Sequence, residues 1–250
     1  MTTRFTDMVA LVTGGGTGIG RATALAFARE GAAVAVAGRS PEPLAETVRL
    51  IETDGGKASA VTADVTHAED VARLVDTTVT RHGGLHIAFN NAGVLIPGLI
   101  AEVDEPTWSS MLATNLTGVW LSMKYEIAHM RSHGGGTIVN TSSIPTTMVP
   151  GLGAYGASKA GVSALTRAAA REHLRDGIRI NTISPGPVDI VMSRAPGETD
   201  AERDARMQTQ HPLGRVARTD EIAAGVLWLA SPESSFTIGH DLVIDGGATA

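Results

Sequence analysis

The sequence lacks cysteine, long apolar runs and a signal-like N-terminus. Without thiols the chain cannot form a disulfide framework or a thiolate metal site, and this composition fits a reducing compartment. A membrane span needs about 20 consecutive apolar residues, and no segment approaches that length. We therefore expect a cytoplasmic protein with no membrane partner.

The sequence is also poor in positive charge. Lysine and arginine total 20 against 26 acidic residues, which gives a formal net charge of −6. Nucleic-acid binding relies on a basic face that neutralises phosphates, and the charge pattern contains none. The 8 histidines form no spaced ligand set with carboxylates, so we expect neither a metal site nor a nucleic-acid partner.

The remaining composition is that of a globular protein. A chain of 250 residues with 43% apolar residues can build one large core, and no linker or repeat divides it. We expect a single domain over residues 1–250. Short apolar runs predict strands at 9–12, 33–37, 58–61, 85–89, 137–141, 178–183 and 242–244. Helical spacing of apolar residues predicts helices at 21–30, 41–53, 68–81, 105–130, 155–174 and 219–229.

This alternation of strands and helices predicts an α/β fold. The expected architecture is Rossmann-like, a doubly wound and mostly parallel seven-stranded sheet with helices on both faces. Residues 188–212 interrupt the pattern with proline, glycine and charge. We interpret this segment as a mobile substrate lid with a short polar helix; a solvated surface loop is the alternative.

A glycine-rich turn follows the first predicted strand. Residues 13–20 read Thr-Gly-Gly-Gly-Thr-Gly-Ile-Gly and lead directly into a predicted helix. Glycines let the backbone approach a pyrophosphate, and the helix N-terminus offers unpaired N–H groups to it. A plain strand-to-helix connection is the alternative, but the position after the first strand favours nucleotide binding.

Tyr155 and Lys159 are the best candidates for chemistry. They are four residues apart, so a helix places both on one face, about 6 Å apart at Cβ. A nearby ammonium should lower the pKa of the phenol from its ordinary value of about 10, and the phenol then acts as general acid or base. Such a pair is also common on helix surfaces. Ser142 strengthens the catalytic interpretation, because it ends a predicted strand 13 residues before Tyr155, where α/β sheets bind ligands.

Several motifs recur in an order typical of one family. The turn has the spacing G-x-x-x-G-x-G, and the later motifs are Asn90-Asn91-Ala92-Gly93, Asn115, Ser142, Tyr155-Gly156-Ala157-Ser158-Lys159, Pro185-Gly186 and Ile244-Asp245-Gly246-Gly247. In this order they make nearly the whole chain resemble the short-chain dehydrogenase/reductase family. The resemblance implies an NAD(P)-dependent oxidoreductase that interconverts a carbonyl and a secondary alcohol by hydride transfer.

The resemblance also implies catalytic roles. Tyr155 would donate the proton to the carbonyl oxygen, and Lys159 would also hold the nicotinamide ribose. Ser142 would orient and polarise the carbonyl; Ser143 is adjacent, but the family's serine-to-tyrosine interval selects Ser142. Asn115 would position a water that links Lys159 to solvent, and a buried asparagine that satisfies helix backbone is the alternative.

Further positions resemble the family's cofactor contacts. Asp64 and Val65 would meet the adenine, although Asp64 is also suited to cap the following helix. The Asn-Ala-Gly run at 91–93 would line the ribose side or brace the sheet. The chain departs from the family at Ile190, where a threonine is usual, and Ser193 is a candidate replacement donor. The expected cofactor-binding residues are Gly14, Thr17, Gly18, Ile19, Gly20, Arg39, Ser40, Asp64, Val65, Asn91, Ala92, Gly93, Tyr155, Lys159, Pro185, Gly186 and Val188.

The end of the second strand bears on the choice of cofactor. Folds that select NAD usually place an acidic side chain there to bind the ribose 2′-hydroxyl. Here Gly38 takes that place, and Arg39 and Ser40 suit the oxygens of a 2′-phosphate. We therefore expect NADP(H), with NAD(H) as the alternative. Thr17 weighs against this choice, because many NADP-using relatives have a basic residue there, and Arg39 can also stack on adenine or remain solvated.

The sequence is also compatible with two alternative functions. An epimerase, dehydratase or enoyl reductase could use the same fold, but in this family the enoyl reductases space tyrosine and lysine more widely and the epimerases carry a longer substrate domain. A dinucleotide sensor without turnover is the second alternative, and retention of the catalytic residues argues against it. The sequence does not distinguish one carbonyl substrate from another. Segments 105–130 and 155–174 carry more small and apolar residues than one sheet contact needs, and the resemblance implies that they pair in a homodimer or homotetramer.

Overall fold

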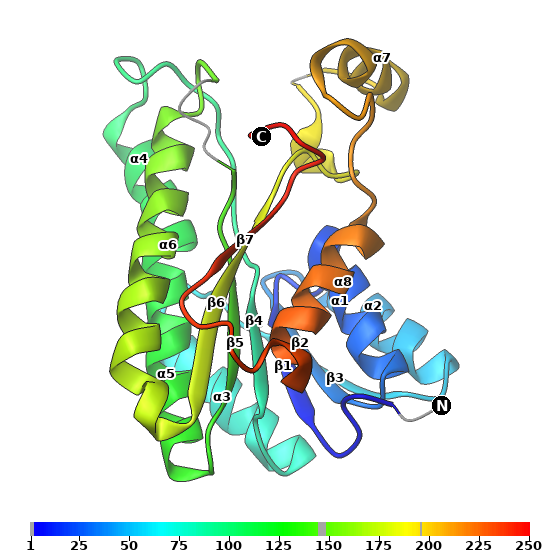
Figure 1. The fold of residues 1–250 in the computed structure, drawn as a ribbon, viewed down its shortest axis with the longest axis vertical. Coiled ribbons are helices and arrows are strands. Elements are labelled where there is room, and N and C mark those ends of the chain that lie inside the picture. The colour runs from blue at the N-terminus through cyan, green and yellow to red at the C-terminus, as the bar shows by residue number, and fades with distance from the viewer. Residues whose placement is uncertain (1–2, 145–148, 196) are drawn as a thin grey trace.

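A single parallel sheet lies at the centre of the structure, a computed structural model that describes residues 3–144, 149–195 and 197–250 (Figure 1). The sheet has seven strands in the order β3-β2-β1-β4-β5-β6-β7, and every pairing is parallel. The strands are β1 (Val9–Thr13), β2 (Ala33–Gly38), β3 (Lys57–Thr62), β4 (Ile87–Asn90), β5 (Gly136–Thr141), β6 (Ile178–Pro185) and β7 (Asp241–Ile244). The predicted doubly wound α/β fold is confirmed.

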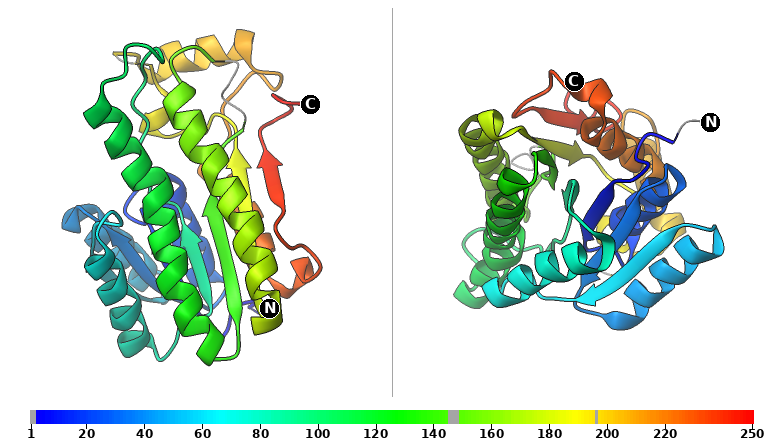
Figure 2. Two further views of the ribbon diagram at one scale, coloured as in Figure 1. Left: turned by 90° about the vertical axis from the view of Figure 1, so that its left-hand side faces the viewer. Right: turned by 90° about the horizontal axis from the view of Figure 1, so that it is seen from below.

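Helices cover both faces of this sheet (Figure 2). On one face lie α1 (Gly18–Arg29), α2 (Pro41–Thr53) and α8 (Thr219–Ala230). On the other lie α3 (Ala68–His82), α5 (Gly118–Ser132) and α6 (Gly153–His173). In the described ranges of the chain, no helix is both long and apolar enough to cross a membrane.

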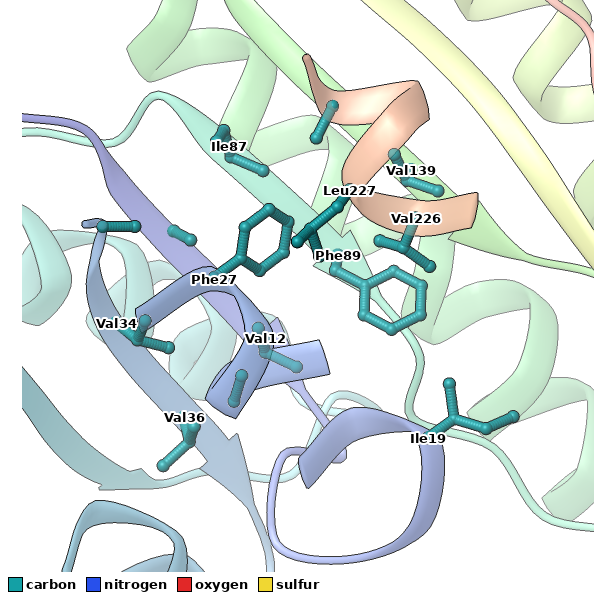
Figure 3. Close-up of a cluster of buried hydrophobic side chains, with 14 of the residues drawn as sticks. Val12, Ile19, Phe27, Val34, Val36, Ile87, Phe89, Val139, Val226 and Leu227 are labelled. Carbon is teal, nitrogen blue, oxygen red and sulfur yellow. The ribbon is translucent and has the colours of Figure 1, made fainter. Parts of the chain in front are cut away.

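The central strands are buried on both sides, which explains their continuous apolar sequences, whereas the edge strands β3 and β7 are only partly buried. All residues of β1 and β4 are buried. Figure 3 shows the core between the sheet and its first helical face, where Phe27 from α1 and Phe89 from β4 lie near Val226 and Leu227 from α8. Full burial of such a side chain stabilises the fold by roughly 1.5–3 kcal/mol, so these contacts hold α1 and α8 on the sheet.

The predicted helix at 105–130 is divided in the structure. It consists of α4 (Glu105–Leu112), a π-helical turn η1 (Ala113–Thr117) and α5. A Cβ on Gly118 would lie 2.8 Å from Val65 Cγ2, so glycine allows the start of α5 to pack closely on the loop after β3. Helical periodicity cannot reveal such a π turn, which often marks a functional position.

The segment at 188–212 contains the predicted polar helix, α7 (Asp200–Gln210), which lies beyond the carboxyl ends of the strands (Figure 1). Arg203 on α7 is only 3% exposed and binds Asp189 at 2.7 Å. The base of the segment is closed by two backbone bonds of 2.8 Å, from Asp189 N–H to Ala217 and from Ala217 N–H to Pro187. The excursion therefore starts and ends at one place on the molecule.

Candidate active site

The loops after β1, β4, β5 and β6 meet at one edge of the sheet, because parallel strands end on the same side. From β1 the chain moves outward through β2 and β3, and then returns to β4 on the opposite side of β1. Open α/β sheets bind ligands at such a switch point. The predicted site residues lie mainly on these loops and on the helices that follow them.

The glycine turn after β1 has a shape that side chains would prevent. Gly14 and Gly18 have φ values of 65° and 51°, and a Cβ on Gly20 would lie 2.2 Å from the Gly14 carbonyl oxygen. α1 begins at Gly18, earlier than predicted, and Arg21 N–H donates to the Thr17 carbonyl at 3.0 Å. The N–H groups before Arg21 precede this first helical bond and lie at the positive end of the helix dipole. The turn therefore offers donors to an anion.

The loop after β4 supports this turn. Asn91 N–H and Ala92 N–H donate to Thr13 Oγ1 at 3.0 and 3.2 Å, and the Asn91 side chain donates to the Thr13 carbonyl at 3.3 Å. Asn91 thus braces the end of β1 and the turn after it, and its expected contact with the cofactor ribose stays a prediction. Gly93 lies deeper in the site, because a Cβ there would be 3.5 Å from Lys159 Nζ.

Tyr155 and Lys159 lie together on α6, as predicted. Lys159 Nζ is 5.8 Å from the centroid of the Tyr155 ring. Both residues are buried, with 8% and 4% of their surface exposed. The ammonium donates to the Thr141 carbonyl at 2.7 Å, so the end of β5 fixes the lysine head beside the phenol.

Burial controls the titration of this pair. It lowers the pKa of Lys159 to about 8, and it raises the pKa of Tyr155 above 10 although a hydrogen bond with Ser143 acts in the opposite direction. The expectation that Lys159 lowers the pKa of Tyr155 is wrong for this structure. Burial removes water from the charged tyrosinate, and this cost exceeds the stabilisation that the hydrogen bond with Ser143 provides. At neutral pH the phenol is protonated, which is the form that donates a proton.

The two serines after β5 have different surroundings. Ser142 is 2% exposed, and its Oγ donates to the Lys159 carbonyl at 2.9 Å and lies 2.8 Å from Ser163 Oγ. Ser143 is half-buried and hydrogen-bonds Tyr155. The prediction that Ser142 faces the substrate is therefore wrong, and Ser143 is the serine beside the phenol. Consecutive residues at a strand end point to opposite sides. An error of one residue in the serine-to-tyrosine interval therefore selects the side chain on the wrong side.

Asn115 lies in the π turn η1 and is fully buried. Its Oδ1 accepts from Val94 N–H, and its Nδ2 donates to the Val94 carbonyl, both at 2.8 Å. Nδ2 also reaches Ser158 Oγ at 3.1 Å. The side chain therefore joins η1 to the loop after β4 and to α6, and it does not satisfy its own helix. Its role in positioning a water stays a prediction.

Asp64 and Val65 follow β3. Asp64 Oδ1 accepts from Thr66 N–H at 2.9 Å and from the Thr66 hydroxyl at 2.8 Å. Burial raises the pKa of the Asp64 carboxyl, but these bonds and the charges of Arg39 and His67 outweigh it, so the net shift is downward. Asp64 does not cap α3, whose N-cap is His67. Val65 is buried, and the adenine contact stays a prediction.

Arg39 and Ser40 are available to a ligand. Both are exposed directly after β2. Within the described residues no hydrogen bond or ion pair holds the Arg39 guanidinium, whose charge contributes to the low pKa of Asp64. Ser40 is the N-cap residue of α2, but its hydroxyl makes no capping bond.

The segment after β6 contains the next predicted contacts. β6 ends at Pro185, and Gly186 N–H donates to the Ile244 carbonyl at 2.9 Å. Val188 is 3% exposed and belongs to the core. The side chain of Val188 is thus structural, and a nicotinamide contact at this segment stays a prediction.

Ile190 lies over the phosphate turn. A Cβ on Gly18 would be 2.9 Å from Ile190 Cγ2, and Ile190 packs against the core cluster that contains Ile19. The Ser193 hydroxyl donates to the Ile190 carbonyl at 2.8 Å. The Ser193 hydroxyl therefore donates within the segment at 188–212, and it does not provide the replacement donor that we expected.

An apolar loop beside Tyr155 was not singled out by the sequence analysis. Its first residues, Val94 and Leu95, pack against the cluster that Tyr155 forms with Met111 and Ala154. Further along, Leu99 and Ile100 are 51% and 68% exposed. The apolar run directly after the Asn-Asn-Ala-Gly motif is the signal that could have identified this loop.

Comparison with known proteins gives close matches over the whole chain. Residues 14–249 match a family model described as enoyl-(acyl carrier protein) reductase. Cyclohexanol dehydrogenase from an Acinetobacter strain is 39% identical, with 100% of this chain and 98% of the relative covered. The 2,5-dichloro-2,5-cyclohexadiene-1,4-diol dehydrogenase of Sphingobium indicum is 41% identical, with 96% of each chain covered.

A solved structure shows the same fold. The crystal structure of a short-chain type dehydrogenase/reductase from Mycobacterium marinum aligns with a TM-score of 0.93. The two chains are 35% identical, and the alignment covers 100% of this chain and 98% of the other.

Proposed function

Because this chain belongs to the short-chain dehydrogenase/reductase family, we propose that Tyr155 is the general acid and base of an enzyme that interconverts a secondary alcohol and a carbonyl. The observation that carries this proposal is the cluster of the buried phenol, Lys159 and Ser143 at the switch point of the sheet. The named relatives are dehydrogenases of cyclic alcohols, so the sensor alternative has no support.

The chain's own residues account for the proton transfer. During reduction the Tyr155 hydroxyl donates its proton to the carbonyl oxygen, and the Ser143 hydroxyl orients that oxygen by a hydrogen bond. Lys159 stabilises the tyrosinate that remains, and oxidation follows the same steps in reverse. A bound nicotinamide supplies or accepts the hydride.

The residues present fit a dinucleotide. The glycine turn leaves no room for a Cβ at Gly20 and offers the N–H groups at the start of α1, which suits the pyrophosphate. Asp64 and Val65 would meet the adenine, and Lys159 the nicotinamide ribose. The Arg39 guanidinium is exposed next to Ser40 and has no ion pair with any described residue, which supports a preference for NADP(H) over NAD(H).

The substrate that fits best is a small neutral cyclic alcohol or its ketone. The names of the two relatives describe dehydrogenases of cyclic alcohols. The apolar loop that starts at Val94 and packs beside Tyr155 supports an apolar substrate. We place the lid at 188–212 over this substrate, and we propose that the protein assembles as a homodimer or homotetramer.

The deciding experiment measures nicotinamide absorbance with a panel of cyclic alcohols and ketones, in both directions and with both cofactors. Tyr155→Phe should lower kcat by at least ~10²-fold, because the ring remains but the proton donor is lost. Cofactor affinity and melting temperature should not change. Wild-type turnover by Tyr155→Phe would overturn the proposed mechanism.

A further inference from the structure

Ser142 belongs to a line of hydroxyl groups that ends at a carboxylate. Ser142 Oγ donates to the Lys159 carbonyl at 2.9 Å and lies 2.8 Å from Ser163 Oγ. The Ser163 hydroxyl donates to Asp241 Oδ2 at 2.9 Å, and the Ser184 hydroxyl donates to Asp241 Oδ1 at 2.5 Å. Asp241, at the start of β7, thus uses one oxygen toward α6 and the other toward β6.

The carboxylate sets the direction of these bonds. Each serine has one hydroxyl proton, whereas an ionised carboxylate only accepts. The Ser163 proton is therefore committed to Asp241, so Ser163 Oγ can only accept in its contact with Ser142. The single Ser142 proton then lies between Ser163 Oγ and the Lys159 carbonyl. Bonds to a charged acceptor are stronger than neutral ones, so Asp241 orders the whole line.

The line of hydroxyl groups ends at the backbone carbonyl of Lys159, whose side-chain ammonium is also held by β5. Thr141 and Ser142 are consecutive at the end of β5, and the Thr141 carbonyl accepts from Lys159 Nζ at 2.7 Å. The Ser142 side chain holds the backbone carbonyl of the same lysine. If α6 slid along β5, the ammonium would move away from Thr141, and its environment would change.

Burial makes these bonds difficult to replace. Ser142 and Ser184 are 2% and 1% exposed, and Ser163 is 8% exposed. Water has little access to such groups, so a lost bond leaves an unsatisfied polar atom that its surroundings must shift to accommodate. β7 lies beside β6 at the edge of the sheet (Figure 1), which lets a residue near the C-terminus act on the centre of the site.

We propose that Asp241, through Ser163 and Ser142, is a positioning residue that holds Lys159 against Thr141 for proton transfer. This inference rests on the proposed function of Tyr155 and Lys159. It assigns Ser142 a task that differs from substrate binding, and it gives Asp241 an indirect part in catalysis.

The test uses Ser163→Ala, which breaks the line in the middle, and Asp241→Asn, which replaces one acceptor oxygen by a donor. Each should lower kcat/KM roughly 10-fold, because small displacements of catalytic groups are costly. Each should also shift the pH profile of kcat/KM, since Lys159 changes its surroundings. Ser163→Thr keeps the hydroxyl and should retain the wild-type profile. The double variant should be no worse than either single variant, because both act through one line.

Thr166→Val is the matched control. Thr166 is a fully buried hydroxyl on the same helix, bonded by Asn140 at 2.9 Å and outside the line to Lys159. This variant should lose a similar amount of thermal stability and keep the wild-type pH profile. Additive effects in the double variant, or the same profile shift in Thr166→Val, would show that the serines act only on stability.

Lys159→Ala separates this inference from the proposed function. If Lys159→Ala keeps wild-type turnover, the proposed function fails. If Lys159→Ala loses turnover while Ser163→Ala keeps the wild-type kcat/KM and pH profile, only the positioning role of Asp241 fails.

Discussion

At the scale of single residues, the exposed guanidinium of Arg39 gives the sharpest prediction about ligand choice. Arg39→Ala should reduce the preference for NADPH over NADH by roughly 1.5–3 kcal/mol, the contribution of one charge-assisted hydrogen bond. The measurement is kcat/KM with each cofactor. Arg49→Ala is a suitable control, because Arg49 is exposed on α2 but paired with Glu46. Equal or better use of NADH by the wild type would exclude this role for Arg39.

The sequence predicted the residue types of the site better than their directions. Motif order placed Tyr155 and Lys159 together because a helix fixes their spacing. The family's serine-to-tyrosine interval selected Ser142 where the structure places Ser143 beside the phenol, since this position depends on the path of the loop between β5 and α6. The sequence also led to the expectation of a lowered pKa for Tyr155, because it shows the nearby charge of Lys159. It does not show burial, which raises the pKa of Tyr155.

At the scale of elements, α5 contributes an ionisable group to the core. Glu126 is 1% exposed, and its Oε2 accepts from Asn90 Nδ2 at 2.9 Å. The same amide donates to Asn140 Oδ1 at 3.0 Å. Asn90 Oδ1 is buried and has no partner among the described residues. A protonated Glu126 offers an O–H donor beside this unsatisfied oxygen, which an ionised one does not.

Burial raises the pKa of Glu126 from 4.5 to about 7, and the bond from Asn90 opposes this shift. The pKa of Glu126 is higher in the folded protein than in the unfolded chain. Protonation of Glu126 therefore contributes stability that is fully present below pH 4.5 and is lost as the pH rises to about 7. This loss amounts to at most about 3 kcal/mol. Glu126→Gln should therefore gain stability relative to the wild type over this interval.

Urea unfolding of both proteins between pH 5 and 8 tests this expectation. The difference between the two free energies of unfolding isolates Glu126 from the other titrating groups. Glu126→Leu should show the same pH dependence from a lower starting stability, because it loses the bond from Asn90. A difference that stays constant over the interval would mean that Glu126 is not protonated in the folded protein.

The sequence predicted the elements of the fold nearly completely. All seven strands appear where apolar runs predicted them, and the central strands have such runs because they are buried on both faces. The early start of α1 and the π turn between α4 and α5 were not predicted. Both depend on contacts between segments far apart in sequence, such as Gly118 with Val65, and periodicity within one segment carries no information about them.

At the scale of the whole molecule, the surface of α5 and α6 predicts self-association. Trp120 on α5 is 46% exposed, and Ala157, Ala160, Ala164 and Ala168 form an exposed stripe along α6. Light scattering at micromolar concentration should give two or four times the chain mass of 25.8 kDa. A charge on this stripe, in Ala164→Arg, should lower that mass, whereas Glu52→Arg on the exposed side of α2 should not. A monomeric wild type would contradict this expectation.

The closed base of the segment at 188–212 has a consequence for how enzymes of this kind can diversify. Pro187 and Ala217 are joined by a hydrogen bond between their backbones. The chain between them therefore starts and ends at one place, although Val188 at its start still packs in the core. Insertions, deletions or a complete graft from a relative can be accommodated there without stretching the central sheet. We therefore expect that evolution can exchange this segment, and with it the recognition of substrates, while β5 and α6, which position Tyr155 and Lys159, remain unchanged. Chimeras joined at these two residues should inherit the donor's substrate range and keep the recipient's choice of cofactor.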